Sequence, residues 1–81
     1  METIWIELNT IRKLKQFVAD CSTLDLELEV ASGEHTANAK SLLGLMTLTL
    51  SGPLALRFQV DPVKREQLMK ILEPYRIYNL C

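Results

Sequence analysis

The sequence predicts an α+β fold, an open-faced sandwich in which helices cover one face of a four-stranded antiparallel sheet. Four segments alternate between apolar and other residues, as strands with one buried side do. The segments around them repeat apolar residues every three or four positions, which is typical of helices packed by one side. The element order is therefore β-α-β-β-α-β-α. With 48% apolar and 23% charged residues, residues 1–81 should form a single folded domain.

The first strand and helix occupy residues 2–22. Residues 2–9 alternate, which predicts a strand with Ile4, Ile6 and Leu8 on its buried face. Either Asn9 or Thr10 can then cap a helix. The predicted buried stripe of that helix consists of Ile11, Leu14, Phe17, Val18 and Cys21.

Three cations, Arg12, Lys13 and Lys15, lie in the first turns of this helix, where positive charge opposes the helix dipole. Two interpretations stay open at this stage. The cations form a solvated basic face that salt screens, or they belong to a site for an anion or an acidic partner, because backbone N–H groups converge there.

A hairpin is predicted next. Residues 24–30 alternate most regularly, with Leu24, Leu26, Leu28 and Val30 turned inward. Residues 31–34, Ala-Ser-Gly-Glu, favour a turn, and residues 35–39 return as a short strand with the small residues Ala37 and Ala39 inside.

A short helix should begin after Ser41, whose hydroxyl can accept a hydrogen bond from a free N–H group of the first turn. Four large apolar residues follow within five positions: Leu42, Leu43, Leu45 and Met46. One and a half helical turns cannot direct all of them inward, so the segment is a candidate docking patch.

The last strand and helix follow a break at residues 51–53. Residues 54–60 predict a strand with Leu54, Leu56, Phe58 and Val60 inward. Asp61 and Pro62 form a helix start, as N-cap and first helical residue. The stripe Val63, Leu68, Ile71 and Leu72 should be buried, and Pro74 should end the helix. The apolar tail, residues 75–81, is expected to pack either on its own domain or on a second copy in a homodimer.

Several function classes are disfavoured by the sequence. A net charge of −1 offers no attraction to nucleic acid. Residues 1–9 resemble neither a signal peptide nor a membrane span, so we expect a cytoplasmic protein without membrane association. Cys21 and Cys81 are expected to be reduced thiols. The single histidine, His35, is expected at a turn or sheet edge, and no metal cluster, catalytic triad or dinucleotide motif is present. We therefore expect neither an enzyme nor a cofactor.

The segment Lys40-Ser41-Leu42-Leu43-Gly44-Leu45-Met46 resembles the second helix of HPr, the bacterial histidine-containing phosphocarrier of the sugar phosphotransferase system. The resemblance extends back through Gln16-Phe17-Val18 without a gap and forward through the last strand and helix, so it covers nearly the whole chain. It implies the HPr-like fold, whose element order is the one expected above.

In that family a histidine at the start of the first helix carries the phosphoryl group, an arginine follows two residues later, and a proline comes next. The ungapped alignment puts Thr10 at the histidine, Arg12 at the arginine and Lys13 at the proline. A threonine hydroxyl needs an activating base and forms a stable ester, whereas a histidine forms a labile phosphoramidate. The resemblance therefore implies a degenerate phosphocarrier site at Thr10 and Arg12.

Two other family features are present. Ser41 matches the serine that a dedicated kinase phosphorylates in Gram-positive HPr, although a plain helix cap explains this serine equally well. The partner-docking surface corresponds to Arg12, Lys13, Leu42, Leu43 and Met46. The expectation is a regulatory or adaptor protein that binds a serine kinase or phosphotransferase proteins through residues 41–46. The alternatives are a phosphocarrier with an unusual acceptor and a structural module that oligomerises through its tail.

Overall fold

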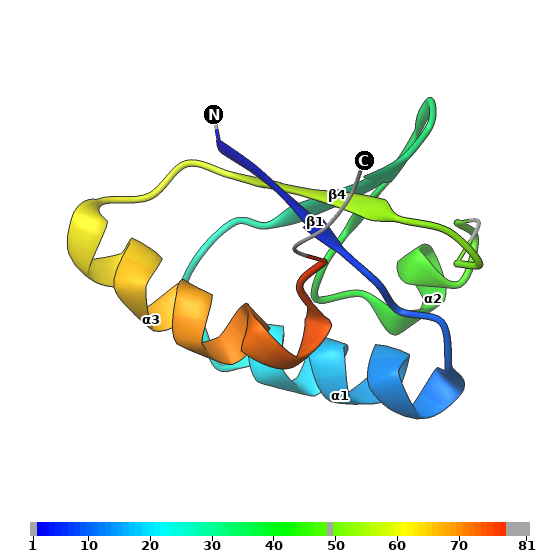
Figure 1. Ribbon diagram of the computed structural model, residues 1–81, viewed down its shortest axis with the longest axis horizontal. Helices are drawn as coiled ribbons and strands as arrows, with labels where there is room; N and C mark the ends of the chain where they lie inside the picture. The colour runs from blue at the N-terminus through cyan, green and yellow to red at the C-terminus, as the bar shows by residue number, and fades with distance from the viewer. Residues whose placement is uncertain (1, 49, 78–81) are drawn as a thin grey trace.

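The computed structural model describes residues 2–48 and 50–77, which form a four-stranded antiparallel sheet of order β1-β4-β2-β3 with the helices on one side of it (Figure 1). The elements are β1 (Glu2–Ile6), α1 (Ile11–Ser22), β2 (Glu29–Ser32), β3 (His35–Asn38), α2 (Leu42–Leu45), β4 (Leu54–Phe58), α3 (Pro62–Leu72) and the 3-10 helix η1 (Glu73–Tyr75). The predicted fold class and element order are confirmed.

The core lies between the sheet and the two long helices. Ile4, Leu56 and Val30 stand in one row across β1, β4 and β2, and all three are buried. Leu14, Phe17 and Cys21 of α1 and Leu68 and Leu72 of α3 close the core from the helical side. The predicted caps also form, because the Thr10 and Asp61 side chains accept hydrogen bonds from the Lys13 and Lys64 N–H groups.

Residues 24–28 are not a strand, which corrects the prediction for residues 24–30. Pairing of β2 with β4 begins only at Glu29, opposite Arg57. Leu24 and Leu26 nevertheless pack partly against the core and Leu28 is buried. The alternation of apolar and polar residues in this segment therefore predicted which side chains are buried, but not which backbone groups form strand hydrogen bonds. The strand instead runs on to Ser32, so the turn is limited to Gly33, with φ of +63°, and Glu34.

Two residues of the predicted helical stripes are exposed. Ile11 is 53% exposed and Val63 is 70% exposed. They are the first residue of α1 and the second residue of α3, so both stand at helix ends. A periodic pattern places residues around a helix but does not show how far the neighbouring sheet extends along it.

The C-terminal segment packs on its own domain as far as it is described. Tyr75 is buried, and its ring meets the Phe17 ring edge to face with centroids 5.2 Å apart. Beyond it, the Ile77 N–H donates a 3.0 Å hydrogen bond to the Trp5 C=O, and Arg76 forms a bridge with Ile6 of β1. Residues 78–81, with Cys81, lie outside the described residues, and pairing of the tail between two copies stays a prediction.

Candidate functional site

Thr10 occupies the N-cap of α1. Its backbone is extended, with φ −132° and ψ 154°, and its Oγ1 accepts a 3.1 Å hydrogen bond from the Lys13 N–H. Its C=O accepts the first bond of the helix, from the Leu14 N–H, at 3.0 Å. A cap of this kind stabilises a protein by about 1 kcal/mol. The exposed Thr10 hydroxyl therefore already has a structural role.

Two cations follow Thr10 after the apolar Ile11. Arg12 is exposed and Lys13 is half-buried. Neither an ammonium nor a guanidinium group has an acceptor lone pair, so neither can take the proton from the Thr10 hydroxyl. A shallow depression of about 440 Å³ lies beside them, lined by Ile11, Arg12, Lys15 and Gln16. The start of α1 thus presents positive charge next to an apolar side chain.

Ser41 is the N-cap of α2, as predicted. Its Oγ accepts a 3.1 Å hydrogen bond from the Gly44 N–H, and its C=O accepts a 3.0 Å bond from the Leu45 N–H. Before the helix, the Ser41 N–H donates to the Asn38 C=O at 3.0 Å. The serine is half-buried, so its side chain is fixed by the backbone and still reaches the surface.

Two neighbours of Ser41 were not singled out from the sequence. The Lys40 ammonium donates to the Leu24 C=O, which ties the segment before α2 to the connection between α1 and β2. Gly44 brings α2 close to its surroundings, since a Cβ atom there would lie 3.1 Å from Ser41 Oγ and 3.5 Å from Ala37 Cβ. Glycine disfavours a helix, and its presence inside this four-residue helix was the one sequence feature that could have indicated a special role for position 44.

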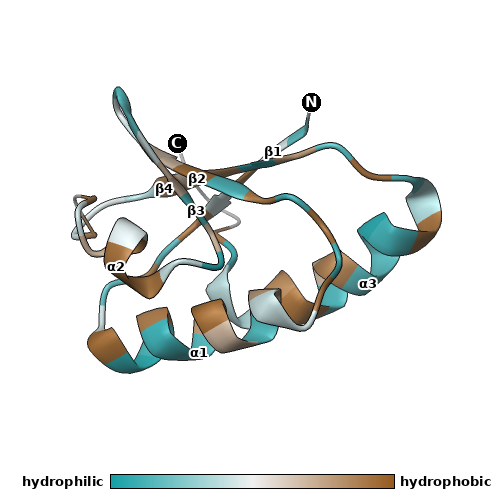
Figure 2. Ribbon diagram, turned by 180° about the vertical axis from the view of Figure 1, so that it is seen from behind, coloured by the Kyte–Doolittle hydropathy of each residue, from teal (hydrophilic) through white to brown (hydrophobic). Residues whose placement is uncertain are grey.

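The predicted docking residues differ in their exposure to solvent. Leu43 is 80% exposed and Met46 is 51% exposed, whereas Leu42 packs partly against the core. Helix α2 contacts α1, and Figure 2 shows the first turn of α1, which has both apolar and polar residues, on the same side of the molecule as α2. We call Ile11, Leu43 and Met46, together with Arg12 and Lys13, the α1–α2 patch. Ile11 is included because it is exposed at the start of α1, although the sequence predicted it to be buried.

His35 lies far from this patch. It is the exposed first residue of β3 and faces Ser32 across the hairpin. The β2–β3 turn lies at the opposite side of the molecule from the start of α1 in both ribbon views (Figures 1 and 2). The structure therefore does not bring His35 to Thr10.

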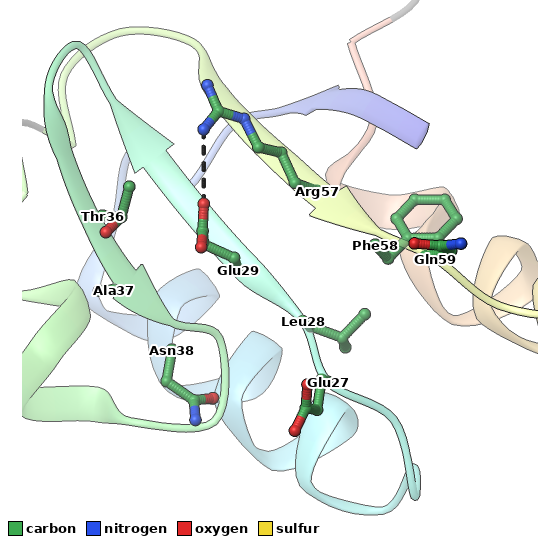
Figure 3. Close-up of a pocket in the computed structure, with 9 residues that line it drawn as sticks. All are labelled: Glu27, Leu28, Glu29, Thr36, Ala37, Asn38, Arg57, Phe58 and Gln59. Carbon is green, nitrogen blue, oxygen red and sulfur yellow. Dashed lines mark hydrogen bonds and ion pairs between the residues drawn. The ribbon is translucent and has the colours of Figure 1, made fainter. Parts of the chain in front are cut away.

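A separate groove of about 770 Å³ lies where residues 27–28 diverge from the end of β4 (Figure 3). Its one ion pair joins Arg57 Nη1 to Glu29 Oε1 at 3.4 Å. The other lining residues are Glu27, Leu28, Thr36, Ala37, Asn38, Phe58 and Gln59. This lining contains no histidine or cysteine, so the groove offers no strong nucleophile.

The one described thiol is chemically quiet. Burial, with a smaller effect of Asp20, raises the pKa of Cys21 to about 12, which keeps the thiol protonated. Within residues 2–48 and 50–77, no three histidine, cysteine or acidic side chains gather as metal ligands would. Over the same residues, no helix is both long and apolar enough to span a membrane.

Comparison with known proteins now decides the family. The family model described as the PTS HPr component phosphorylation site matches residues 10–75, from the α1 cap to the end of η1. This chain belongs to the HPr family. The crystal structure of HPr-C-His from Thermoanaerobacter tengcongensis is similar to it, with a TM-score of 0.74 and 26% identity over 91% of this chain and 89% of that chain. No match is found among curated proteins.

The predicted resemblance is thus confirmed for both sequence and fold. As a member of the HPr family, the chain is related to the phosphocarrier proteins of the sugar phosphotransferase system. The matched region contains both candidate phosphate acceptors, Thr10 and Ser41. Each of them is an N-cap, one for α1 and one for α2.

Proposed function

We propose that this HPr protein is a cytoplasmic regulatory or adaptor protein of the phosphotransferase system and does not carry phosphate on a histidine. It acts by binding partners, not as an enzyme. The observation that carries the proposal is the position of Thr10. Its hydroxyl caps α1 at the place where the ungapped alignment puts the carrier histidine of the family.

The chemistry of the start of α1 supports this proposal. A carrier must accept phosphate and release it again, and a phosphothreonine ester is too stable for rapid release. The Thr10 oxygen uses a lone pair on the Lys13 N–H, and the neighbouring Arg12 and Lys13 side chains cannot act as a base. His35 does not replace the missing carrier histidine at this place, because it lies in β3 at the hairpin, away from the start of α1.

Ser41 is the proposed site of regulatory phosphorylation. It is half-buried at the surface, and its oxygen accepts a hydrogen bond from the Gly44 N–H. A phosphate would add about −1.5 to −2 charges next to the α1–α2 patch. That charge would change the attraction between the cationic side chains of the patch and an acidic partner.

The α1–α2 patch is the proposed partner surface. Leu43 and Met46 offer exposed apolar area, and Arg12 and Lys13 supply positive charge. The partner proposed for this surface is a protein with apolar and acidic side chains, such as a serine kinase or a protein of the phosphotransferase system. Leu42 supports α2 from beneath, since it packs partly against the core.

Intact mass spectrometry after two separate incubations tests the proposal. In one, the protein is mixed with phosphoenolpyruvate and the first enzyme of the phosphotransferase system. In the other, it is mixed with ATP and the serine kinase that modifies HPr proteins. We expect a phosphate only with the kinase, mapped to Ser41 and absent from Ser41→Ala. A phosphoenolpyruvate-derived phosphate on Thr10 or His35 would overturn the proposal in favour of a carrier with an unusual acceptor.

A further inference from the structure

Gly44 is the residue that limits the space around the Ser41 hydroxyl. A Cβ atom at position 44 would lie 3.1 Å from Ser41 Oγ and 3.3 Å from Ser41 Cβ, which is closer than ordinary van der Waals contact. Ala37 Cβ, 3.5 Å away on the β3 side, bounds the same space. A side chain at position 44 could be accommodated only if Ser41 moved.

The backbone gives no other reason for a glycine here. Gly33 is the one glycine with a positive φ among residues 2–48 and 50–77, so the conformation at position 44 is open to any residue. Glycine is also a poor helix former compared with alanine, and α2 is only four residues long. The close approach to Ser41 is therefore what distinguishes glycine from alanine at this position.

We propose that Gly44 is a positioning residue for the phosphorylation of Ser41. Because it has no side chain, it lets Ser41 Oγ occupy the capping position and leaves space beside that oxygen for the incoming phosphoryl group. This inference rests on the proposed function of Ser41 as a regulatory phosphate acceptor. It adds that the acceptor geometry is set by the residue three positions later.

The reaction itself balances without any group on Gly44. The Ser41 oxygen forms a bond to the γ-phosphorus of ATP while the bond between that phosphorus and the bridging oxygen breaks. ADP leaves with the electrons of the broken bond, and the hydroxyl proton passes to a base of the kinase. Transfer requires the attacking oxygen to be in line with the leaving oxygen, so a displaced Ser41 rotamer slows the reaction.

The test compares Gly44→Ala with Gly52→Ala. Gly52 is the matched control, because a Cβ atom there would have no neighbour within 4 Å. The first measurement needs no kinase: the hydrogen exchange rate of the amide at position 44, which donates to Ser41 Oγ. After division by the intrinsic rate for each sequence, we expect Gly44→Ala to raise this rate above the wild-type value, towards that of Ser41→Ala, which removes the acceptor. Gly52→Ala should leave it at the wild-type value.

The second measurement is kcat/KM for the serine kinase, with phosphate mapped to Ser41 and folding checked by circular dichroism. We expect Gly44→Ala to lower it by between about tenfold and about hundredfold. Gly52→Ala should retain the wild-type value. A circular dichroism spectrum equal to that of the wild type excludes unfolding as the cause of a slower reaction.

The outcomes separate the two proposals. Unchanged amide exchange in Gly44→Ala, or a kinase rate equal to the wild-type rate, overturns the role of Gly44 and leaves Ser41 as the acceptor. If the wild-type protein itself accepts no phosphate from a kinase that modifies a control HPr, the regulatory role of Ser41 falls, and the role of Gly44 falls with it.

Discussion

The Tyr75 hydroxyl donates a 2.8 Å hydrogen bond to the Asp20 carboxylate and so joins the C-terminal segment to α1. The second carboxylate oxygen of Asp20 accepts a 2.9 Å bond from the Gln16 amide, which fixes the carboxylate on the helix surface. Edge-to-face contact between Tyr75 and Phe17 lies beside this bond. Tyr75 is therefore attached to the helix whose first residue lies in the α1–α2 patch.

Replacing Tyr75 by phenylalanine should lower the free energy of unfolding by about 1–2 kcal/mol. The substitution removes a hydrogen bond to a charged group but keeps the aromatic contact with Phe17. Urea unfolding should show a lower midpoint with an unchanged slope. In a double-mutant cycle with Asp20→Ala, which removes the acceptor, the two losses should not add, because both substitutions remove one bond. Full additivity would show that the bond contributes no stability.

Stability should fall at alkaline pH through Cys21. Burial raises the pKa of this thiol from 9.0 to about 12 in the folded protein. The unfolded chain loses the proton first, so the contribution is complete below about pH 9 and decreases as the pH rises towards about 12. The free energy of unfolding can be measured by chemical unfolding between about pH 8 and 10.5, the range in which the loss should begin. Over this range it should fall more for the wild type than for Cys21→Ala. Parallel pH profiles for the two proteins would contradict this.

The sequence predicted most of the fold because its signals are local. The Thr10 and Asp61 caps, the order of the strands along the chain and the inward face of β4 all follow from neighbouring residues. Residues 24–28 were assigned wrongly because strand pairing depends on a distant segment. Pairing of β2 with β4 starts at Glu29, and nothing in the local alternation reports that limit.

The candidate site shows the same division. The sequence predicted the Ser41 cap and the exposure of part of the apolar run after it. It could not predict that Leu45 would be the fully buried residue of this run and Leu42 a partly buried one, or that Ile11 would be exposed. Gly44 was missed for a related reason. Its importance comes from two distances, to Ser41 and to Ala37, that exist only after α2 packs on β3.

If Thr10 is what prevents phosphocarrier chemistry, then Thr10→His should create an acceptor. The imidazole would stand at the start of α1 with Arg12 retained two residues later, and a phosphohistidine is labile enough for transfer. We expect an acid-labile phosphate from phosphoenolpyruvate and the first enzyme of the system. The same variant carrying His35→Ala should retain the label, and Thr10→Ser should show none. An unlabelled Thr10→His protein would mean that Lys13, or the loss of the threonine cap, also blocks the reaction.

Two truncations distinguish tail packing within the chain from tail pairing between copies. A chain ending at Ile77 keeps the Tyr75 bond to Asp20 and the Ile77 bond to Trp5, so it should remain folded with the stability of the full chain. A chain ending at Pro74 also loses the buried Tyr75 ring, and deletion of a buried aromatic side chain costs about 3–5 kcal/mol.

Light scattering gives the mass of each form in solution. A full-length dimer that becomes a monomer on removal of residues 78–81 would favour the oligomeric module over the adaptor. If the tail serves only its own domain, all the folded forms should be monomers.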